Sequence, residues 1–244
     1  MRTALVSDVH GNAVALEALL ADLERRPVDQ VVTLGDIAQG GPEPALVVDR
    51  LAELGWPVVL GNADAFLLDP EAGAERPDEA QLERRAWSVE RLGPARLEAI
   101  RSYAATVEAP LGAGLTLLAF HGSPRSYDDF LFPETPDRVF RTLLGESRAS
   151  VLAGGHIHLQ FVRRVGDALF VNPGSVGLSY DHQQAEEGLR ADPWAAYAVV
   201  ETGGEGELEV AFRRVPVDVG ALVDAVLGSG MPGADAVAAR WRPR

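Results

Sequence analysis

Five short polar clusters contain the residue types that bind metal ions in proteins. They are Asp8-x-His10, Gly35-Asp36, Gly61-Asn62, His121-Gly122 and Gly155-His156-x-His158. Each follows a short apolar run that predicts a β-strand, and together they contain four of the five histidines in the chain. Scattered surface histidines would not coincide with strand ends so regularly. We therefore interpret the clusters as one metal site rather than as separately capped strand ends.

These residue types favour hydrolysis of a phosphate ester. The chain has no cysteine, so any metal must be held by nitrogen and oxygen atoms. Mixed His, Asp and Asn ligands suit Mn, Fe, Zn, Ni or Co better than Mg or Ca. Two such ions about 3.5–4 Å apart acidify a water and clamp the phosphoryl oxygens. Holding two cations that close requires a bridging anion, and one carboxylate can serve both.

The elements that must position the clusters alternate along the first part of the chain. Strands are predicted at 2–7, 29–34 and 57–60, and helices at 13–25 and 42–54, the second ending at Gly55. This order favours an α/β fold with a mainly parallel sheet, whose ligands gather at the carboxyl ends of the strands. Residues 65–105 differ, because two helices, 79–91 and 95–103, are predicted around Gly93-Pro94. We interpret 65–105 as a helical cap inserted into a single domain of residues 1–244.

The later residues predict a second set of strands. A hairpin is expected within 106–119 around Gly112-Ala-Gly114, a helix from Pro136 to Leu144, and a short strand at 150–153. Two further hairpins span 161–171 and 194–215, and a helix at 218–227 precedes a Gly- and Pro-bearing tail. The clusters at His121 and Gly155 again follow predicted strands directly.

Composition narrows the functional classes. Hydrophobic residues make up 47% of the chain, and 22 basic against 36 acidic residues give a formal net charge of -14. Such a surface repels a phosphate backbone, which disfavours extended nucleic-acid binding and a nuclease. Bound metal ions can still invert the charge locally for a small phosphorylated substrate. With neither a signal peptide nor a membrane-length apolar run, we expect a cytoplasmic protein that does not bind membranes; the sequence does not define its oligomeric state.

The ordered clusters resemble those of the calcineurin-like metallophosphoesterase superfamily. Asn172-Pro-Gly-Ser175 after the last cluster is similar to the small bacterial and archaeal phosphodiesterase branch. The resemblance covers residues 3 to about 177, and it implies a four-layer α/β/β/α sandwich with two mixed sheets. It also implies that the hairpin at 194–215 completes the second sheet.

The resemblance implies a ligand set by position. One metal would be held by Asp8, His10, Asp36 and His158, and the other by Asp36, Asn62, His121 and His156, with Asp36 as the bridge. A metal-activated water or hydroxide would then attack phosphorus in line, with Asp36, His121 and His156 at the reacting centre. Manganese is the first expectation for both ions, and Fe, Zn, Ni and Co are the alternatives.

One position departs from the family pattern. Much of the superfamily has a histidine after Gly-Asn that protonates the leaving group, whereas this chain has Ala63. Asp64 remains, and in the family it holds a neighbouring ligand in place. General-acid help is typically worth about 10²–10⁴-fold, so we expect a substrate with a good leaving group or an acid from elsewhere. His182 is the one spare histidine for that role, with a solvent-exposed loop position as the alternative.

Further residues are candidates for substrate binding. Asn62 lies at the site, and Arg125, four residues past His121, is placed to contact a phosphate or to remain on the surface. Asn12 belongs to a phosphate-facing turn or is the N-cap of the helix that follows it.

The favoured function is hydrolysis of small, nucleotide-like phosphodiesters. A phosphomonoesterase acting on nucleotides, or on phosphoserine or phosphothreonine in proteins, is the alternative within enzymes. A non-catalytic scaffold protein with the same fold is the third hypothesis. It is disfavoured because all seven ligand positions carry ligand-type residues.

Overall fold

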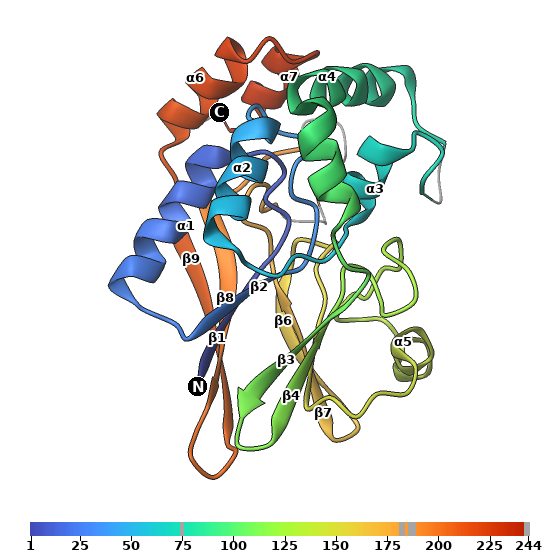
Figure 1. Cartoon of the computed structure of the whole chain (residues 1–244), viewed down its shortest axis with the longest axis vertical. Helices are drawn as coiled ribbons and strands as arrows, with labels where there is room; N and C mark the ends of the chain where they lie inside the picture. Colours follow the sequence, from blue (N-terminus) through green and yellow to red (C-terminus); the bar gives the residue numbers. More distant parts are fainter. Residues whose placement is uncertain (74–75, 181–183, 185–188, 242–244) are drawn as a thin grey trace.

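The structure, a computed structural model, describes residues 1–73, 76–180, 184 and 189–241. It contains two mixed sheets (Figure 1). The first has the order β2 (Gln30–Thr33), β1 (Arg2–Val6), β8 (Trp194–Thr202), β9 (Leu208–Pro216). The second has the order β3 (Val107–Gly112), β4 (Leu115–Ala119), β5 (Val151–Ala153), β7 (Ala168–Pro173), β6 (Gln160–Val165).

Three apolar layers hold the sheets and helices together. Alternate residues of β1 point to opposite faces: Ala4 and Val6 pack under the helices, while Leu5 packs between the two sheets. The third layer, which includes Phe140 and Phe170, lies between the second sheet and α5 (Asp137–Leu144). Helix α1 (Ala13–Arg25) and α5 lie on opposite sides of the paired sheets (Figure 1). The four-layer α/β/β/α sandwich is therefore confirmed.

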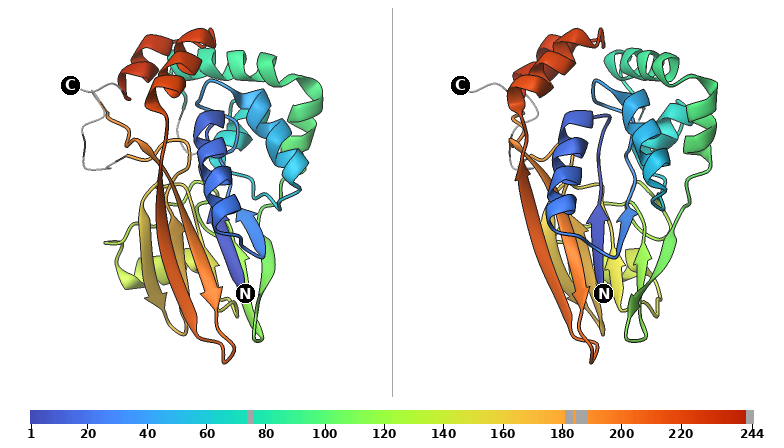
Figure 2. Two further views of the ribbon diagram at one scale, coloured as in Figure 1. Left: turned by 90° about the vertical axis from the view of Figure 1, so that its left-hand side faces the viewer. Right: turned by 60° about the vertical axis from the view of Figure 1, so that its left-hand side comes forward.

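Most helices gather over the first sheet and one end of the molecule. They are α1, α2 (Pro44–Leu54), α3 (Asn62–Leu68), α4 (Glu79–Arg101), α6 (Val219–Gly228) and α7 (Ala234–Ala239). Helices α6 and α7 lie beside α4 in all views (Figure 2), and Arg91 of α4 donates a hydrogen bond to the carbonyl of Ser229. Among the described residues, no helix is long and apolar enough to cross a membrane.

The structure corrects the predicted place of the late hairpin. We expected residues 194–215 to complete the second sheet, but β8 pairs antiparallel with β1 and so belongs to the first. The strand is suited to this central position, because Ala195 through Val200 are all buried. Strand β9 then forms the edge of that sheet.

The sequence predicted helix ends at glycine more accurately than it predicted short strands and helices. Gly93 has φ 66° and ψ 173°, which interrupts α4 at the predicted Gly93-Pro94 break. Gly55 adopts the left-handed conformation that ends α2. The predicted strand at 57–60 is reduced to single bridges from Val58 to Thr33 and from Val59 to Ala104. Helix α7 was not predicted, because six residues carry too little periodicity.

Candidate metal centre

The five polar clusters meet at one edge of the two sheets. The first two follow β1 and β2, Asn62 begins α3, and the last two follow β4 and β5. Their side chains form two groups, Asp8 with His10 and His158, and Asp36 with His121 and His156. Within each group the candidate ligand atoms lie within 4.8 Å of one another. The structure thus brings together residues as far apart as 8 and 158.

The backbone at these positions is unusual. Of the residues that the structure describes, six other than glycine have positive φ, and five of these are candidate ligands: Asp8 (56°), His10 (49°), Asp36 (55°), His156 (69°) and His158 (56°). The left-handed conformation costs such residues about 1–3 kcal/mol each and persists only where the surroundings enforce it. Strain concentrated at the ligands indicates that side-chain direction here serves a function.

Glycines in the clusters permit close approach between the loops. A Cβ atom on Gly61 would overlap Asp36 Oδ1 and the Asp36 backbone nitrogen. A Cβ atom on Gly155 would overlap the Ser7 hydroxyl. The Gly-Asn and Gly-His patterns therefore have a steric reason, since only glycine lets these loops pack against their neighbours.

Backbone carbonyls orient three of the four imidazoles. The Nδ1 atoms of His10, His121 and His158 lie 2.7, 2.7 and 2.6 Å from the carbonyl oxygens of Gln39, Leu34 and Leu178. An imidazole that donates from Nδ1 presents the Nε2 lone pair to a ligand, the usual arrangement around a protein-bound metal.

The oriented Nε2 atoms converge. His10 Nε2 lies 3.0 Å from His158 Nε2, and His121 Nε2 lies 2.9 Å from Asn62 Oδ1. Asp36 Oδ2 stands between the two groups, 3.7 Å from His10 Nε2 and 3.4 Å from His121 Nε2. This is the position that a bridging carboxylate requires.

Unsatisfied buried atoms test whether the residues fit a metal. Within the described residues, His156 Nε2 is buried and forms no hydrogen bond, and buried Asp8 Oδ1, also without an assigned hydrogen bond, has an ionic contact of 3.2 Å with His158 Nε2. Orphaned polar atoms of this kind are rare in native proteins and call for an ion or another partner. Together with the Asp, His and Asn donor set, they fit divalent transition metals.

The buried charges perturb one another strongly. Burial alone would lower the pKa of His121, but the adjacent Asp36 carboxylate raises it to about 9. Burial would raise the pKa of Asp36, yet its contact with His121 holds it well below the usual range. For His156, burial and the charge of His121 lower the pKa to about 4. A dense set of coupled groups at a cleft is typical of a functional site.

Asp64 has a positioning role in the structure. Its fully buried carboxylate accepts hydrogen bonds from the backbone N–H groups of Ile37 (2.9 Å) and Ala38 (3.2 Å), directly after Asp36. Burial and the charge of Asp36 raise its pKa to about 7. Asp64 therefore holds the loop that carries Asp36, while Asp36 Oδ1 in turn accepts from the Ala63 N–H at 2.8 Å.

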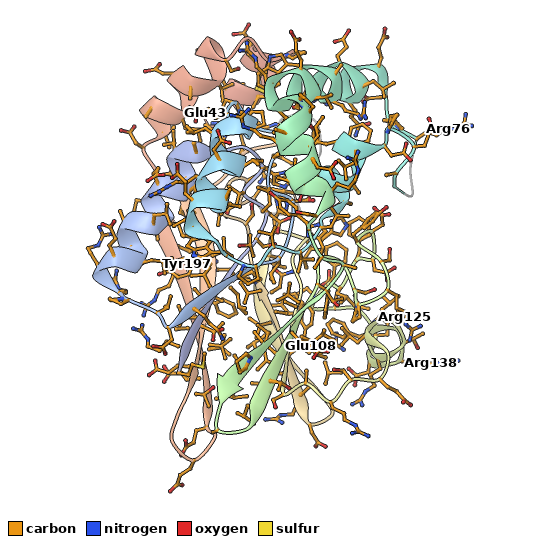
Figure 3. The ribbon with its side chains drawn as sticks, in the orientation of Figure 1. Glu43, Arg76, Glu108, Arg125, Arg138 and Tyr197 are labelled. Atoms are coloured by element: carbon orange, nitrogen blue, oxygen red, sulfur yellow. The ribbon has the colours of Figure 1, made fainter. Side chains whose placement is uncertain are left out.

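Three other sequence candidates lie away from the two groups or outside the description. Asn12 is buried; its Oδ1 caps α1 by accepting from Ala15 N–H, and its Nδ2 donates to the Gly177 carbonyl. These contacts favour the N-cap alternative over substrate binding. The Arg125 side chain packs against Gly145 at the end of α5 (Figure 3), in a pocket next to His121. His182 lies outside the described residues.

A cavity of about 440 Å³ opens over the metal-ligand groups. Candidate ligands His10, Asn62 and His156 line it, and so does Ala63. The other lining residues were missed by sequence reasoning, among them Gln39, Arg84, Asp128, Phe130 and Arg240. No motif marks them, because a helical arginine or a loop phenylalanine resembles any surface residue until the chain folds.

The chain is similar to known proteins over nearly its whole length. A family model described as a calcineurin-like phosphoesterase superfamily domain matches residues 1–192. An uncharacterized protein of Methanocaldococcus jannaschii is 23% identical over 240 residues, covering 94% of this chain and 93% of that protein. A metallophosphoesterase crystal structure from Sphaerobacter thermophilus has a TM-score of 0.75 and 25% identity, covering 99% and 98% of the two chains. A symmetrical bis(5'-nucleosyl)-tetraphosphatase of Pectobacterium carotovorum is 43% identical over 79 residues, 31% of this chain and 28% of that protein.

Proposed function

The chain belongs to the calcineurin-like phosphoesterase superfamily, and from this membership we propose that it is a dimetal-dependent hydrolase of small phosphodiesters. The observation that carries the proposal is the pair of ligand groups with Asp36 Oδ2 between them. In this proposal Asp8, His10 and His158 hold one ion, Asn62, His121 and His156 hold the other, and Asp36 bridges them. When bound, the two ions would acidify a water for attack on phosphorus and neutralise the phosphoryl oxygens. Mn²⁺ is the proposed native ion.

The chain's own residues would prepare this site in advance. Carbonyl groups fix the ring orientation of three imidazoles, and Asp64 fixes the loop that carries Asp36. Burial of Asp8 and His121 excludes water from competing for their donor atoms. Preorganised polar groups of this kind stabilise developing charge without reorganising during the reaction.

Ala63 supports a diester with a good leaving group. Its methyl group lines the cavity at the position where a general acid would otherwise stand. Expulsion of a basic alkoxide would therefore lack a proton donor at this position. A nucleotide-like substrate is also supported by the local similarity to the nucleosyl-tetraphosphatase. Phosphomonoester hydrolysis, on nucleotides or phosphoproteins, remains the alternative.

Metal analysis and a substrate panel test the proposal. We expect about two divalent ions per chain in purified protein, and activity that disappears on chelation and returns with Mn²⁺. Bis(p-nitrophenyl) phosphate and p-nitrophenyl phosphate share a leaving group, and we expect the diester to have the higher kcat/KM. A monoester preference of about tenfold or more would favour the alternative.

A further inference from the structure

The cavity over the candidate metal centre has a charge opposite to that of the chain. Three arginines (Arg76, Arg84 and Arg240) and one aspartate (Asp128) line it. Acidic residues nevertheless outnumber basic ones 36 to 22 in the whole chain. Arg76 is exposed and points into solvent (Figure 3), whereas Arg84 and Arg240 are half-buried. The positive charge of this cavity therefore lies mainly on Arg84 and Arg240 in its wall.

Arg84 and Arg240 are brought together by the fold. Arg84 lies in the second turn of α4, and Arg240 directly follows α7. Both side chains line the same cavity, and burial and the charge of Arg84 both lower the pKa of Arg240. Within the described part of the chain, neither guanidinium forms an ion pair or donates a hydrogen bond. Neighbouring Arg85, in contrast, donates to the carbonyls of Phe66 and Leu67 and fastens α4 to α3.

Two adjacent, partly buried guanidinium groups are unfavourable until an anion binds between them. Guanidinium groups donate forked hydrogen bonds that match phosphate oxygens, and such bonds are about twice as strong as neutral ones. Among the described residues these donors have no protein partner, so a bound anion would replace only their solvating water. A phosphate bound between the two guanidinium groups would offset their mutual repulsion and accept hydrogen bonds from both.

The pair lies close to the reacting centre without belonging to it. Tyr180 interacts electrostatically with Arg240, and its ring packs edge-on against the His158 imidazole with centroids 5.2 Å apart. Arg240 lines the same cavity as the candidate ligands His10 and His156, and it belongs to neither ligand group. A phosphate held by the arginines would be a neighbour of the phosphate that reacts, not the same group.

Building on the proposed function, we propose that Arg84 and Arg240 bind a second, non-scissile phosphate, so that the preferred substrates contain a chain of two or more phosphates. Hydrolysis of such a P–O–P bridge adds water. The water oxygen bonds to phosphorus, the bridging P–O bond breaks, its electron pair leaves with the departing phosphate, and the released proton passes to solvent. A phosphate leaving group needs no general acid at neutral pH, which agrees with Ala63.

Substitution of the pair tests this assignment in the metal-loaded protein. We compare Arg84→Gln, Arg240→Gln and the double variant on diadenosine tetraphosphate and on bis(p-nitrophenyl) phosphate. Each single variant should raise KM for the tetraphosphate by about 10- to 100-fold, the loss expected for a hydrogen bond to a charged group. The loss on the single-phosphate diester should be at least about fivefold smaller. Arg84→Lys and Arg240→Lys should recover part of the loss.

A matched control separates this effect from net charge. Arg138 is exposed on α5 (Figure 3), and Arg138→Gln removes the same charge from a distant surface. It should change KM for the tetraphosphate less than twofold. Equal losses on both substrates in the cavity variants, or an unchanged tetraphosphate KM, would overturn the assignment.

A binding measurement distinguishes failure of this inference from failure of the proposed function. We titrate inorganic tripolyphosphate into the metal-loaded protein and the variants by calorimetry. If no ester is hydrolysed, the proposed hydrolase function fails, yet a Kd that rises about tenfold in each Gln variant still supports the anion site. If the esters are hydrolysed and the Kd is unchanged, the anion site is wrong while the hydrolase function stands.

Discussion

The loops that carry the candidate metal ligands and the helical wall across the cavity are built in different ways. In the loops, Asp8 and His121 are almost fully buried, and five ligand positions have left-handed backbones. On the wall, Arg84 and Arg240 are half-buried at a helix start and a helix end. The loops are thus buried and held in an unusual backbone conformation, whereas the two arginines on the wall remain partly exposed. We infer that the loops supply the chemistry, which needs fixed geometry, and that the wall selects the substrate.

The largest effect should follow from changing Asp36, the carboxylate proposed to bridge the two ions. Asp36→Asn removes the charge between the two ligand groups, and we expect kcat to fall at least about 10³-fold. Metal analysis should show the content falling from two ions to one or fewer. Asp49→Asn is the control, because Asp49 pairs with Arg96 on the outer surface. Full activity and metal content in Asp36→Asn would remove the distinction between the two regions.

The next largest effect should follow from adding one methyl group to a ligand loop, at Gly61. In Gly61→Ala the new Cβ atom overlaps Asp36 Oδ1, so Asp36 must move, and we expect about a 10²-fold loss of kcat. Gly228→Ala, which meets open space in α6, should leave activity unchanged and should not lower the melting temperature. Steady-state kinetics and thermal unfolding measure both. Normal kcat in Gly61→Ala would mean that the loops tolerate displacement.

An increase in kcat is expected from a substitution at Ala63, where the ligand loops meet the helical wall. Ala63 lines the cavity at the start of α3, and Ala63→His would place a proton donor there. We expect kcat for an alkyl diester to rise about tenfold and kcat for a p-nitrophenyl diester to change little, because only the alkoxide needs protonation. Ala63→Leu controls for side-chain size. An equal change for both leaving groups would show that no missing acid limits the rate.

The smallest effect is expected from an apolar residue at the rim. Phe130 is 55% exposed. The centroid of its ring lies 4.4 Å from that of the His156 ring and 5.8 Å from that of Phe132, on which it stacks. Phe130→Leu should raise KM about threefold for substrates with an aromatic group and leave kcat nearly unchanged. Val139→Ala, an exposed apolar site on α5, is the control. A large fall in kcat would place Phe130 with the loops instead.

The ligand loops could be predicted from the sequence, whereas the residues of the helical wall could not. The ligand loops were predicted because Asp8, His10 and the other clusters combine rare residue types with strand ends, and both signals are local. The sheet that receives the late hairpin was not, because pairing of β8 with β1 depends on contacts almost 200 residues apart. Arg84 and Arg240 were missed for a related reason, since each has the local pattern of an ordinary surface arginine.

The amino-acid sequence alone therefore determined which residues are suited to hold metal ions and in which order their strands occur. Metal ligation admits few side-chain types, so those residues are recognisable one cluster at a time. Only the tertiary structure decided which ligands form a group, where Asp36 stands between the groups, and which arginines face the cavity. Those properties depend on distances between separate elements, and folding sets these distances by packing both faces of β1 at once.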